Sequence, residues 1–210
     1  MSTDVAHIDP PKDDVPAVPR RVMVADDEHL VAAGLINMLE DLGYEAVGPA
    51  NSAASAVTMA ESASPDVALL DIRMPDADGL AAAEQIYTQL GIPVIMVSAY
   101  SDPEYVAIGQ RIGVYGYLLK PVTADQLRIG IDIAWSRHLA DLELSGQVTD
   151  LEDRLAQRKV IEQAKWIIVK RKQISEPEAM RMLQKQARNG RKQLVEVAQA
   201  VIDSDDLLGD

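Results

Sequence analysis

Carboxylates, one hydroxyl and one ammonium group follow short apolar runs in the first 120 residues. Asp26 and Asp27 come after the first run, Asp71 ends the third, Ser98 the fourth and Lys120 the fifth. Carboxylates held close together repel one another, and hard oxygen ligands favour Mg²⁺ as the cation that relieves this repulsion. A carboxylate beside Mg²⁺, an ammonium and a hydroxyl is suited to accept a phosphoryl group, because the positive charges offset the charge that builds on the transferred oxygens. We therefore expect Asp71 to be a phosphate acceptor.

Such a site needs a scaffold that brings several strand ends together. Apolar runs of strand length alternate with segments of helical spacing, and the runs lie at residues 22–25, 44–48, 67–70, 93–97 and 114–119. This alternation predicts an α/β fold, a five-stranded doubly wound parallel sheet with helices on both faces. In such sheets ligands bind outside the carboxyl ends of the strands, which is where the candidate residues stand.

Spacing and capping signals mark the helices between these runs. Apolar residues at helical spacing predict helices at 29–42, 52–62 and 80–90. The Asp-Pro-Glu sequence at 102–104 predicts another helix start. Thr123 and Gln126 predict a capping box at the start of the next helix.

Four motifs at the run ends resemble those of the receiver domains of two-component response regulators: VADDE, DIRMPDADG, SAY and YLLKP. The resemblance covers residues 20–135 and implies the flavodoxin-like receiver fold. It also implies that Asp71 is phosphorylated by a sensor histidine kinase.

The same resemblance assigns roles to the residues around Asp71. It implies a Mg²⁺ site made of oxygen ligands: Asp26, Asp27, Asp71 and the backbone carbonyl of Arg73. It implies three side chains that contact the phosphoryl group or switch when it arrives: Ser98, Tyr117 and Lys120. A cis peptide bond is implied between Lys120 and Pro121.

An aspartate nucleophile also occurs in phosphatases of the haloacid-dehalogenase type. Those enzymes need a second aspartate two residues after the nucleophile, and Arg73 stands at that position. The sequence therefore favours a regulator that is not an enzyme, with a phosphatase as the alternative that turnover of phosphoesters would test.

The charge of the chain is unevenly distributed. The formal net charge is −13, yet residues 154–192 hold twelve basic residues against three acidic ones. Such a surface can offset nucleic-acid phosphates, although a run of charge often forms only a solvated face. The candidate phosphate contacts are basic side chains of this segment: Lys165, Lys170, Arg171, Lys172, Lys185, Arg188, Arg191 and Lys192.

The second half of the chain resembles the ANTAR family of small three-helix RNA-binding antiterminator domains over residues 151–203. The matching residues are Ala164-Lys165, Ser175-Glu176, Ala179, Leu183, Ala187, Arg191 and Val197-Ala198. The resemblance implies binding of hairpin RNA that prevents transcription termination. An output through protein contact or dimerisation is the alternative, and duplex DNA is a further candidate target.

Two positions differ from the common ANTAR pattern. Trp166 replaces a glycine after the Ala-Lys pair, and Gln184 replaces an arginine after Leu183. One interpretation is that Trp166 fills a gap between helices in a core without phenylalanine. The other is that it stacks on an unpaired base.

A helical linker or coiled coil is predicted at residues 136–150. Apolar residues recur there and just beyond at alternating steps of four and three: Leu144, Val148, Leu151 and Leu155. Gly146 weakens the helical pattern. A homodimer through this segment or the helical domain is one interpretation, and a helix that packs on its own domain is the other.

The remaining features concern the ends of the chain and the cellular compartment of the protein. Residues 1–19 are predicted to be a disordered tail and residues 204–210 an acidic tail. The histidines lack the spacing of metal ligands, so His29 and His138 are expected to face solvent. The chain has no cysteine, no apolar run long enough for a bilayer and no secretory signal, which predicts a cytoplasmic protein without a membrane partner.

Overall fold

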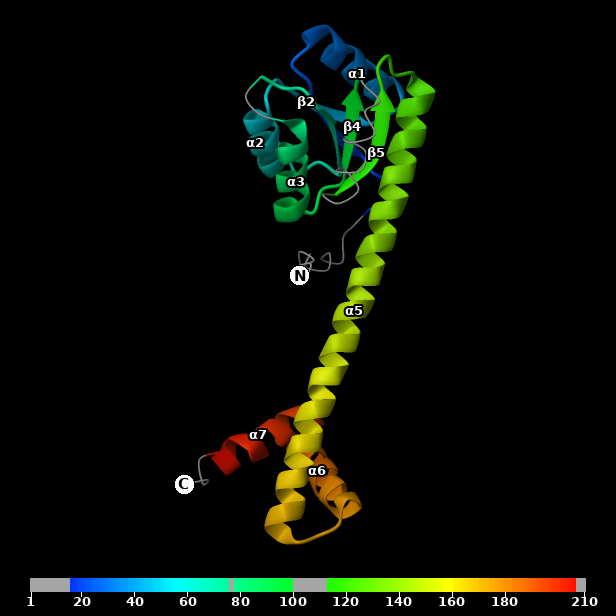
Figure 1. The fold of residues 1–210 in the computed structure, drawn as a ribbon. Helices are drawn as coiled ribbons and strands as arrows, with labels where there is room; N and C mark the ends of the chain where they lie inside the picture. Colours follow the sequence, from blue (N-terminus) through cyan, green and yellow to red (C-terminus); the bar gives the residue numbers. More distant parts are fainter. Residues whose placement is uncertain (1–15, 76–77, 100–112, 207–210) are drawn as a thin grey trace. The chain divides into compact units, whose positions relative to one another are not determined.

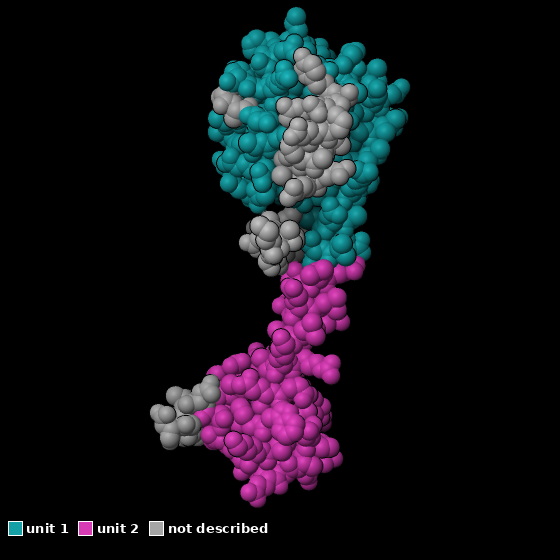
Figure 2. Space-filling model, viewed as in Figure 1, with its two compact units in different colours: residues 1–145 teal, residues 146–210 magenta. Residues whose placement is uncertain are grey.

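The computed structural model describes residues 16–75, 78–99 and 113–206. The chain divides into two compact units, Met1–Ser145 and Gly146–Asp210 (Figure 2). The helix predicted to begin at 102–104 lies outside the described residues, as does most of the predicted N-terminal tail.

A five-stranded sheet forms the centre of the first unit (Figure 1). Its strands are β1 (Arg21–Ala25), β2 (Glu45–Ala50), β3 (Val67–Asp71), β4 (Val94–Ser98) and β5 (Val114–Leu119). Every neighbouring pair is parallel, and the order is β2-β1-β3-β4-β5. The predicted parallel sheet is therefore confirmed, and its order reverses direction at β1, where ligands bind in folds of this kind.

Helices cover both faces of this sheet. One face carries α1 (His29–Asp41) and the first turns of α5 (Ala124–Lys172), and the other carries α2 (Ala53–Ala63) and α3 (Gly79–Leu90). Side chains alternate along β1, so Val22 and Val24 pack toward α1 and α5 while Met23 packs toward α2 and α3. The two aliphatic layers bury both faces of the strands, as near-continuous apolar runs predict.

The turn between β3 and α3 is held tightly against the strand. Gly79 begins α3, and a Cβ atom there would lie 1.9 Å from the backbone oxygen of Asp71. Asp78 caps the helix, because its Oδ1 accepts a hydrogen bond from the backbone N–H of Leu80 at 3.0 Å. The glycine is required by this close approach of helix and strand.

Helix α5 continues from Ala124 through Gly146 to Lys172. Thr123 and Gln126 form the predicted capping box, with the Thr123 N–H 3.0 Å from the Gln126 Oε1 and the Gln126 N–H 3.3 Å from the Thr123 Oγ1. Gly146 does not interrupt the helix. The division between the two units falls at that residue.

The second unit is a three-helix arrangement. The end of α5, α6 (Glu176–Gly190) and α7 (Leu194–Asp206) enclose a small apolar core: Ala164, Ile168, Ala179, Leu183, Ala187, Val197, Ala198 and Ile202. Ser175 and Glu178 form a capping box at the start of α6. Helix α6 ends at Gly190, because Arg191 takes the left-handed conformation that ends a helix.

In the described part of the chain, no helix has the length and apolar character needed to cross a bilayer.

Candidate functional site

The carboxyl ends of β1, β3 and β5 bring three charged side chains together. Ala25 pairs in register with Leu70, so the residues that follow them, Asp26 and Asp71, lie at the same level of the sheet. Lys120 follows β5, and its Nζ lies 2.8 Å from the Asp26 Oδ2 and 3.1 Å from the Asp71 Oδ2. Both carboxylates are buried. The predicted convergence of these three residues is confirmed.

Backbone amides fix the orientation of both buried carboxylates. The Asp71 Oδ1 accepts a hydrogen bond from the Ile72 N–H at 2.8 Å, and the Asp26 Oδ1 accepts one from the Glu28 N–H at 3.0 Å. Each aspartate therefore directs its other oxygen toward Lys120.

Three carboxylates at this edge are arranged to share a cation. Asp26, Asp27 and Asp71 each offer one oxygen atom, and these atoms all lie within 4.8 Å of one another. Asp27 is exposed, so the group is open to solvent on one side. An all-oxygen donor set of this charge fits a hard divalent cation such as Mg²⁺.

Burial and charge pairing shift the pKa values of the residues in this cluster in opposite directions. Burial raises the pKa of Asp26, although hydrogen bonds from Lys120 and the Glu28 N–H lower it in part. Burial alone lowers the pKa of Lys120, but its hydrogen bonds to Asp26 and Asp71 outweigh this effect and leave the pKa raised. The lysine is therefore firmly charged.

The remaining predicted site residues lie on the same strands. Ser98 is buried at the end of β4, and its backbone oxygen accepts a hydrogen bond from the Lys120 N–H at 2.8 Å. Tyr117 lies on β5 and packs partly buried against the core beneath α2 and α3. Arg73 is exposed, and its backbone forms an isolated antiparallel β-bridge with Asp78 in the turn before α3. The Lys120–Pro121 peptide is cis, as predicted.

Sequence reasoning missed one member of the charged cluster. The Glu28 Oε1 lies 3.4 Å from the Lys120 Nζ, which adds a third carboxylate to the environment of the lysine. Glu28 precedes α1 and directly follows the aspartate pair, so its place in the VADDE motif was the available signal.

His138 is buried, which contradicts the expectation that it faces solvent. It packs edge-on to the ring of Tyr115, with centroids 5.6 Å apart, and beside Trp135. Burial lowers its pKa to about 4. The spacing of Ile131, Trp135 and His138 along α5 would have indicated this shared buried face.

The basic candidates in the second unit fall into two groups. Lys165 is tied by its Nζ to the Glu162 Oε2 at 2.6 Å and the Glu176 Oε2 at 3.0 Å, and Arg171 pairs with Asp205. Hydrogen bonds to Glu162 and then Glu176 raise the pKa of Lys165. The other six candidates are exposed: Lys170, Lys172, Lys185, Arg188, Arg191 and Lys192.

Two apolar features of α5 are exposed. Trp166 is 56% exposed, so the interpretation that it fills a gap in the core is wrong. The four seam residues of the predicted coiled coil are 48–60% exposed: Leu144, Val148, Leu151 and Leu155. These four side chains therefore do not form a buried face within the described residues.

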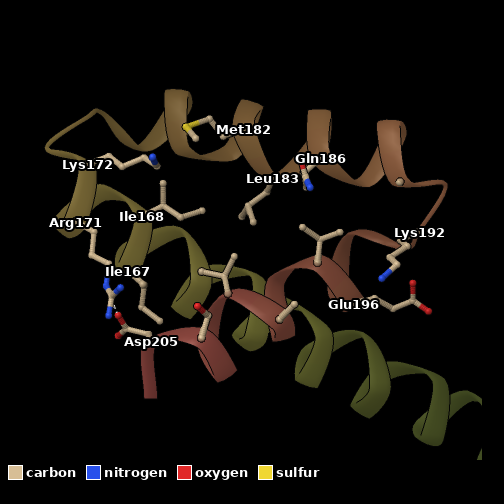
Figure 3. Close-up of a pocket in the computed structure, with 15 residues that line it drawn as sticks. Ile167, Ile168, Arg171, Lys172, Met182, Leu183, Gln186, Lys192, Glu196 and Asp205 are labelled. Atoms are coloured by element: carbon tan, nitrogen blue, oxygen red, sulfur yellow. Dashed lines mark ion pairs between the residues drawn. The ribbon is translucent and has the colours of Figure 1, made fainter. Parts of the chain in front are cut away.

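A cleft in the second unit lies among α5, α6 and α7 (Figure 3). Its volume is about 700 Å³, and Ile168, Leu183 and Val197 form part of its apolar wall. The ion pair between Arg171 and Asp205 lies at one side. No sequence signal marked this cleft, because it depends on how three helices pack.

Comparison with known protein families divides the chain in the same way. The model of the response regulator receiver domain matches residues 22–132, and that of the ANTAR domain matches residues 149–202. Transcriptional regulatory protein PdtaR of Mycobacterium tuberculosis is 36% identical over 188 residues, which cover 90% of this chain and 92% of PdtaR.

Solved structures resemble the first unit. The receiver domain of a modulated diguanylate cyclase from Desulfovibrio desulfuricans has a TM-score of 0.55 and 33% identity, with 59% of this chain and 98% of that chain covered. A CheY-like receiver from Methanospirillum hungatei has a TM-score of 0.54 and 26% identity over 59% and 98% of the two chains. The chain therefore belongs to the response regulators, with an N-terminal receiver domain followed by a C-terminal ANTAR domain.

Proposed function

We propose that the chain is a cytoplasmic phosphorylation-controlled regulator that receives a phosphoryl group on Asp71 from a sensor histidine kinase. Its output is the binding of hairpin RNA by the ANTAR domain, which prevents transcription termination. The observation that carries the proposal is the convergence of Asp26, Asp27, Asp71 and Lys120 at one edge of the sheet.

The receiver site is suited to phosphoryl transfer at Asp71. Transfer from a phosphohistidine breaks its P–N bond and forms a P–O bond to an Asp71 carboxylate oxygen, while the histidine nitrogen keeps the bonding electrons. Lys120 already lies 3.1 Å from the Asp71 Oδ2 and would offset charge on the transferred oxygens. Ser98 would donate its hydroxyl hydrogen to one of those oxygens, and Tyr117 would respond to the change at Ser98.

The donor set supports a role for Mg²⁺ in the same step. Asp26, Asp27 and Asp71, with the backbone carbonyl of Arg73, would hold the ion, which supplies positive charge for the phosphoryl oxygens. Burial of Asp26 and Asp71 strengthens this electrostatic effect.

The RNA output rests on the charge of the second unit. The six exposed candidates on α5, on α6 and just after α6 are available to phosphates. RNA would have to compete with carboxylates for the other two, Lys165 and Arg171. Affinity that comes from phosphate contacts falls as salt rises.

A direct test treats the protein with acetyl phosphate and Mg²⁺ and measures intact mass. We expect the mass of one phosphoryl group to be added to the wild type and not to Asp71→Asn. Phosphorylation of the Asp71→Asn variant would contradict the assignment of the acceptor.

A gel shift with RNA that carries hairpin loops tests the output. Arg188→Gln combined with Arg191→Gln should weaken binding and reduce its salt dependence, because both side chains are exposed on the basic unit. Arg128→Gln with Arg137→Gln makes the same charge change on exposed positions of the receiver and should leave binding unchanged. Tighter binding to duplex DNA than to hairpin RNA would contradict the proposed target.

The exposed seam of α5 favours a second candidate output, which is dimerisation. Leu144, Val148, Leu151 and Leu155 would be buried if two chains paired their α5 helices. Sedimentation with and without acetyl phosphate would detect this state. A regulator that dimerises on phosphorylation and fails to bind hairpin RNA would favour output through protein contact.

A further inference from the structure

Trp166 stands out in the ANTAR unit because its indole is exposed between positions that are buried. Ala164 and Ile168, two residues before and after it on α5, belong to the core, whereas Trp166 is 56% exposed. A lone exposed apolar side chain is ordinary on a protein surface. The surroundings of the indole therefore decide what its exposure means.

The face of α5 that carries Trp166 is basic and polar. Residues three, four or seven positions apart share a helix face, which places Lys159, Glu162, Gln163, Val169 and Lys170 around the indole. Lys159, Gln163 and Lys170 are exposed, whereas Glu162 and Val169 are partly buried. The two lysines are eleven positions apart, about 16 Å along the helix axis. An aromatic ring thus stands between two cations.

The acidic residues of this region are occupied within the protein. Glu162, one turn before Trp166, pairs with Lys165 at 2.6 Å, and Glu176 pairs with the same lysine at 3.0 Å. Glu178 accepts hydrogen bonds from the Ser175 N–H at 2.9 Å and the Ser175 hydroxyl at 2.7 Å. These three are the acidic residues of 154–192, and each of them has a partner within the unit other than Lys159 and Lys170.

The coiled-coil seam ends before it reaches Trp166. Steps of three or four from Leu155 arrive at Arg158, Lys159 and Glu162. In a parallel pair of helices, like charges would face each other at these positions and oppose pairing. The apolar seam and the indole are therefore separate surfaces, and the charge beside the indole matches a polyanion.

We infer that Trp166 is a stacking platform for an unpaired RNA base, with Lys159 and Lys170 on the adjoining phosphates. The inference rests on the proposed RNA-binding function and names a side chain that would contact an unpaired loop base. A base presents its face to an aromatic ring only where it is unpaired. Lys165 is instead a positioning residue that ties the start of α6 to α5 through Glu162 and Glu176.

The chain offers an internal reporter for this contact. Its two tryptophans are Trp135, which is 5% exposed in the receiver unit, and Trp166. Trp135→Phe therefore leaves a single indole at the inferred contact. Titration with a two-hairpin RNA that has unpaired loops should quench its fluorescence. The same RNA with its loops annealed to complementary oligonucleotides should quench it far less.

Binding measurements on full-length variants complete the test. Trp166→Ala should bind the two-hairpin RNA about 5- to 150-fold more weakly, the range that corresponds to about 1–3 kcal/mol per stacked base. Trp166→Phe should retain most of the affinity. Met182→Ala removes another exposed apolar side chain of the same unit and should change affinity little. Circular dichroism checks that each variant is folded.

The outcomes separate this inference from the function on which it rests. Failure of the wild type to bind the RNA would contradict the proposed function and the inference with it. Binding that is unchanged in Trp166→Ala, or equally weakened in Met182→Ala, would overturn the inference alone. Burial of the Trp166 indole on raising protein concentration without RNA would assign it to a contact between chains and would also overturn it.

Discussion

At the scale of single residues, Lys120 has the largest electrostatic role. Its ammonium group joins Asp26 and Asp71, and Glu28 lies within 3.4 Å. The positions of Asp26, Asp71 and Lys120 were predictable because each follows an apolar run, and parallel strands end at one edge of a sheet. The contact with Glu28 had only the VADDE motif as a signal, because its distance from Lys120 depends on the path of the chain between β1 and α1.

Loss of the lysine should destabilise the receiver. Lys120→Met leaves two buried carboxylates facing each other, and removal of one partner from a buried ion pair costs about 3 kcal/mol or more. Urea unfolding followed by Trp135 fluorescence measures the change. The cost should shrink as pH falls toward the raised pKa of Asp26, because protonation removes the repulsion. Arg128→Gln breaks an exposed pair with Asp132 and should cost less than about 0.5 kcal/mol; an equal loss in both variants would refute this account.

His138 should make the receiver sensitive to acid. Its pKa is lowered to about 4, against an ordinary value near 6.5. As pH falls, the unfolded chain therefore binds a proton at this histidine at a higher pH than the folded protein does. The resulting stability is present above about pH 6.5 and is lost as pH falls toward 4, by up to about 3 kcal/mol. Unfolding free energies across this range should be flatter for His138→Gln than for the wild type. An unchanged profile would show that other groups cause the acid sensitivity.

At the scale of elements, helix ends and strand register determine the geometry of the site. A capping signal placed the start of α5 correctly, because a capping box is a local interaction between residues three apart. The cleft among α5, α6 and α7 was not predictable in this way, and the burial of His138 was indicated only by its helical spacing from Ile131 and Trp135. They depend on which helix faces meet, and single-sequence periodicity gives only part of that information.

Gly79 connects α3 to β3, the strand that ends at Asp71. Because a Cβ atom there would lie 1.9 Å from the Asp71 backbone oxygen, Gly79→Ala must displace the strand end or the helix. We expect a loss of about 2 kcal/mol or more in unfolding free energy and slower phosphorylation by acetyl phosphate. Gly146→Ala is the matched control, since no atom lies within 4 Å of the added methyl group, and it should not destabilise the fold. Normal phosphorylation of Gly79→Ala would show that the turn tolerates this displacement.

The seam of α5 should control self-association. Leu151→Glu places a charge in the middle of the apolar stripe and should weaken any dimer at least tenfold in sedimentation equilibrium, because the carboxylate would be buried on pairing. Trp166→Ala lies beyond the charged end of the seam and should leave the association constant unchanged. Dimerisation that is insensitive to Leu151→Glu would place the interface elsewhere.

At the scale of the whole molecule, the chain contains two units with separate cores. The receiver core covers both faces of the sheet, and the ANTAR core is enclosed by three helices. The division was visible in the sequence as a change from an acidic to a basic segment. Each unit also holds one tryptophan, so each can be followed separately.

Magnesium should stabilise only the receiver. At a Mg²⁺ concentration 100 times its Kd, linkage predicts about 2.7 kcal/mol of added stability. In Trp166→Phe, the fluorescence of the remaining Trp135 reports the change in receiver stability. In Trp135→Phe, the remaining Trp166 should report no change in the stability of the ANTAR unit. Because the pKa of Asp26 is raised, protons compete with Mg²⁺ for this carboxylate. The stabilisation by Mg²⁺ should therefore be complete above that pKa and be lost as pH falls through it. Equal shifts at both tryptophans would mean that the units unfold together.

The shared ammonium group has one more implication. An amine has three hydrogens to donate, and Lys120 is already within reach of three carboxylates. Phosphorylation of Asp71 would add phosphoryl oxygens that compete with these carboxylates for the ammonium group. We expect Glu28, which is the most distant of the three and immediately precedes α1, to lose its contact with Lys120 first. Arrival of the phosphoryl group would then change the ion pairing at the amino end of α1.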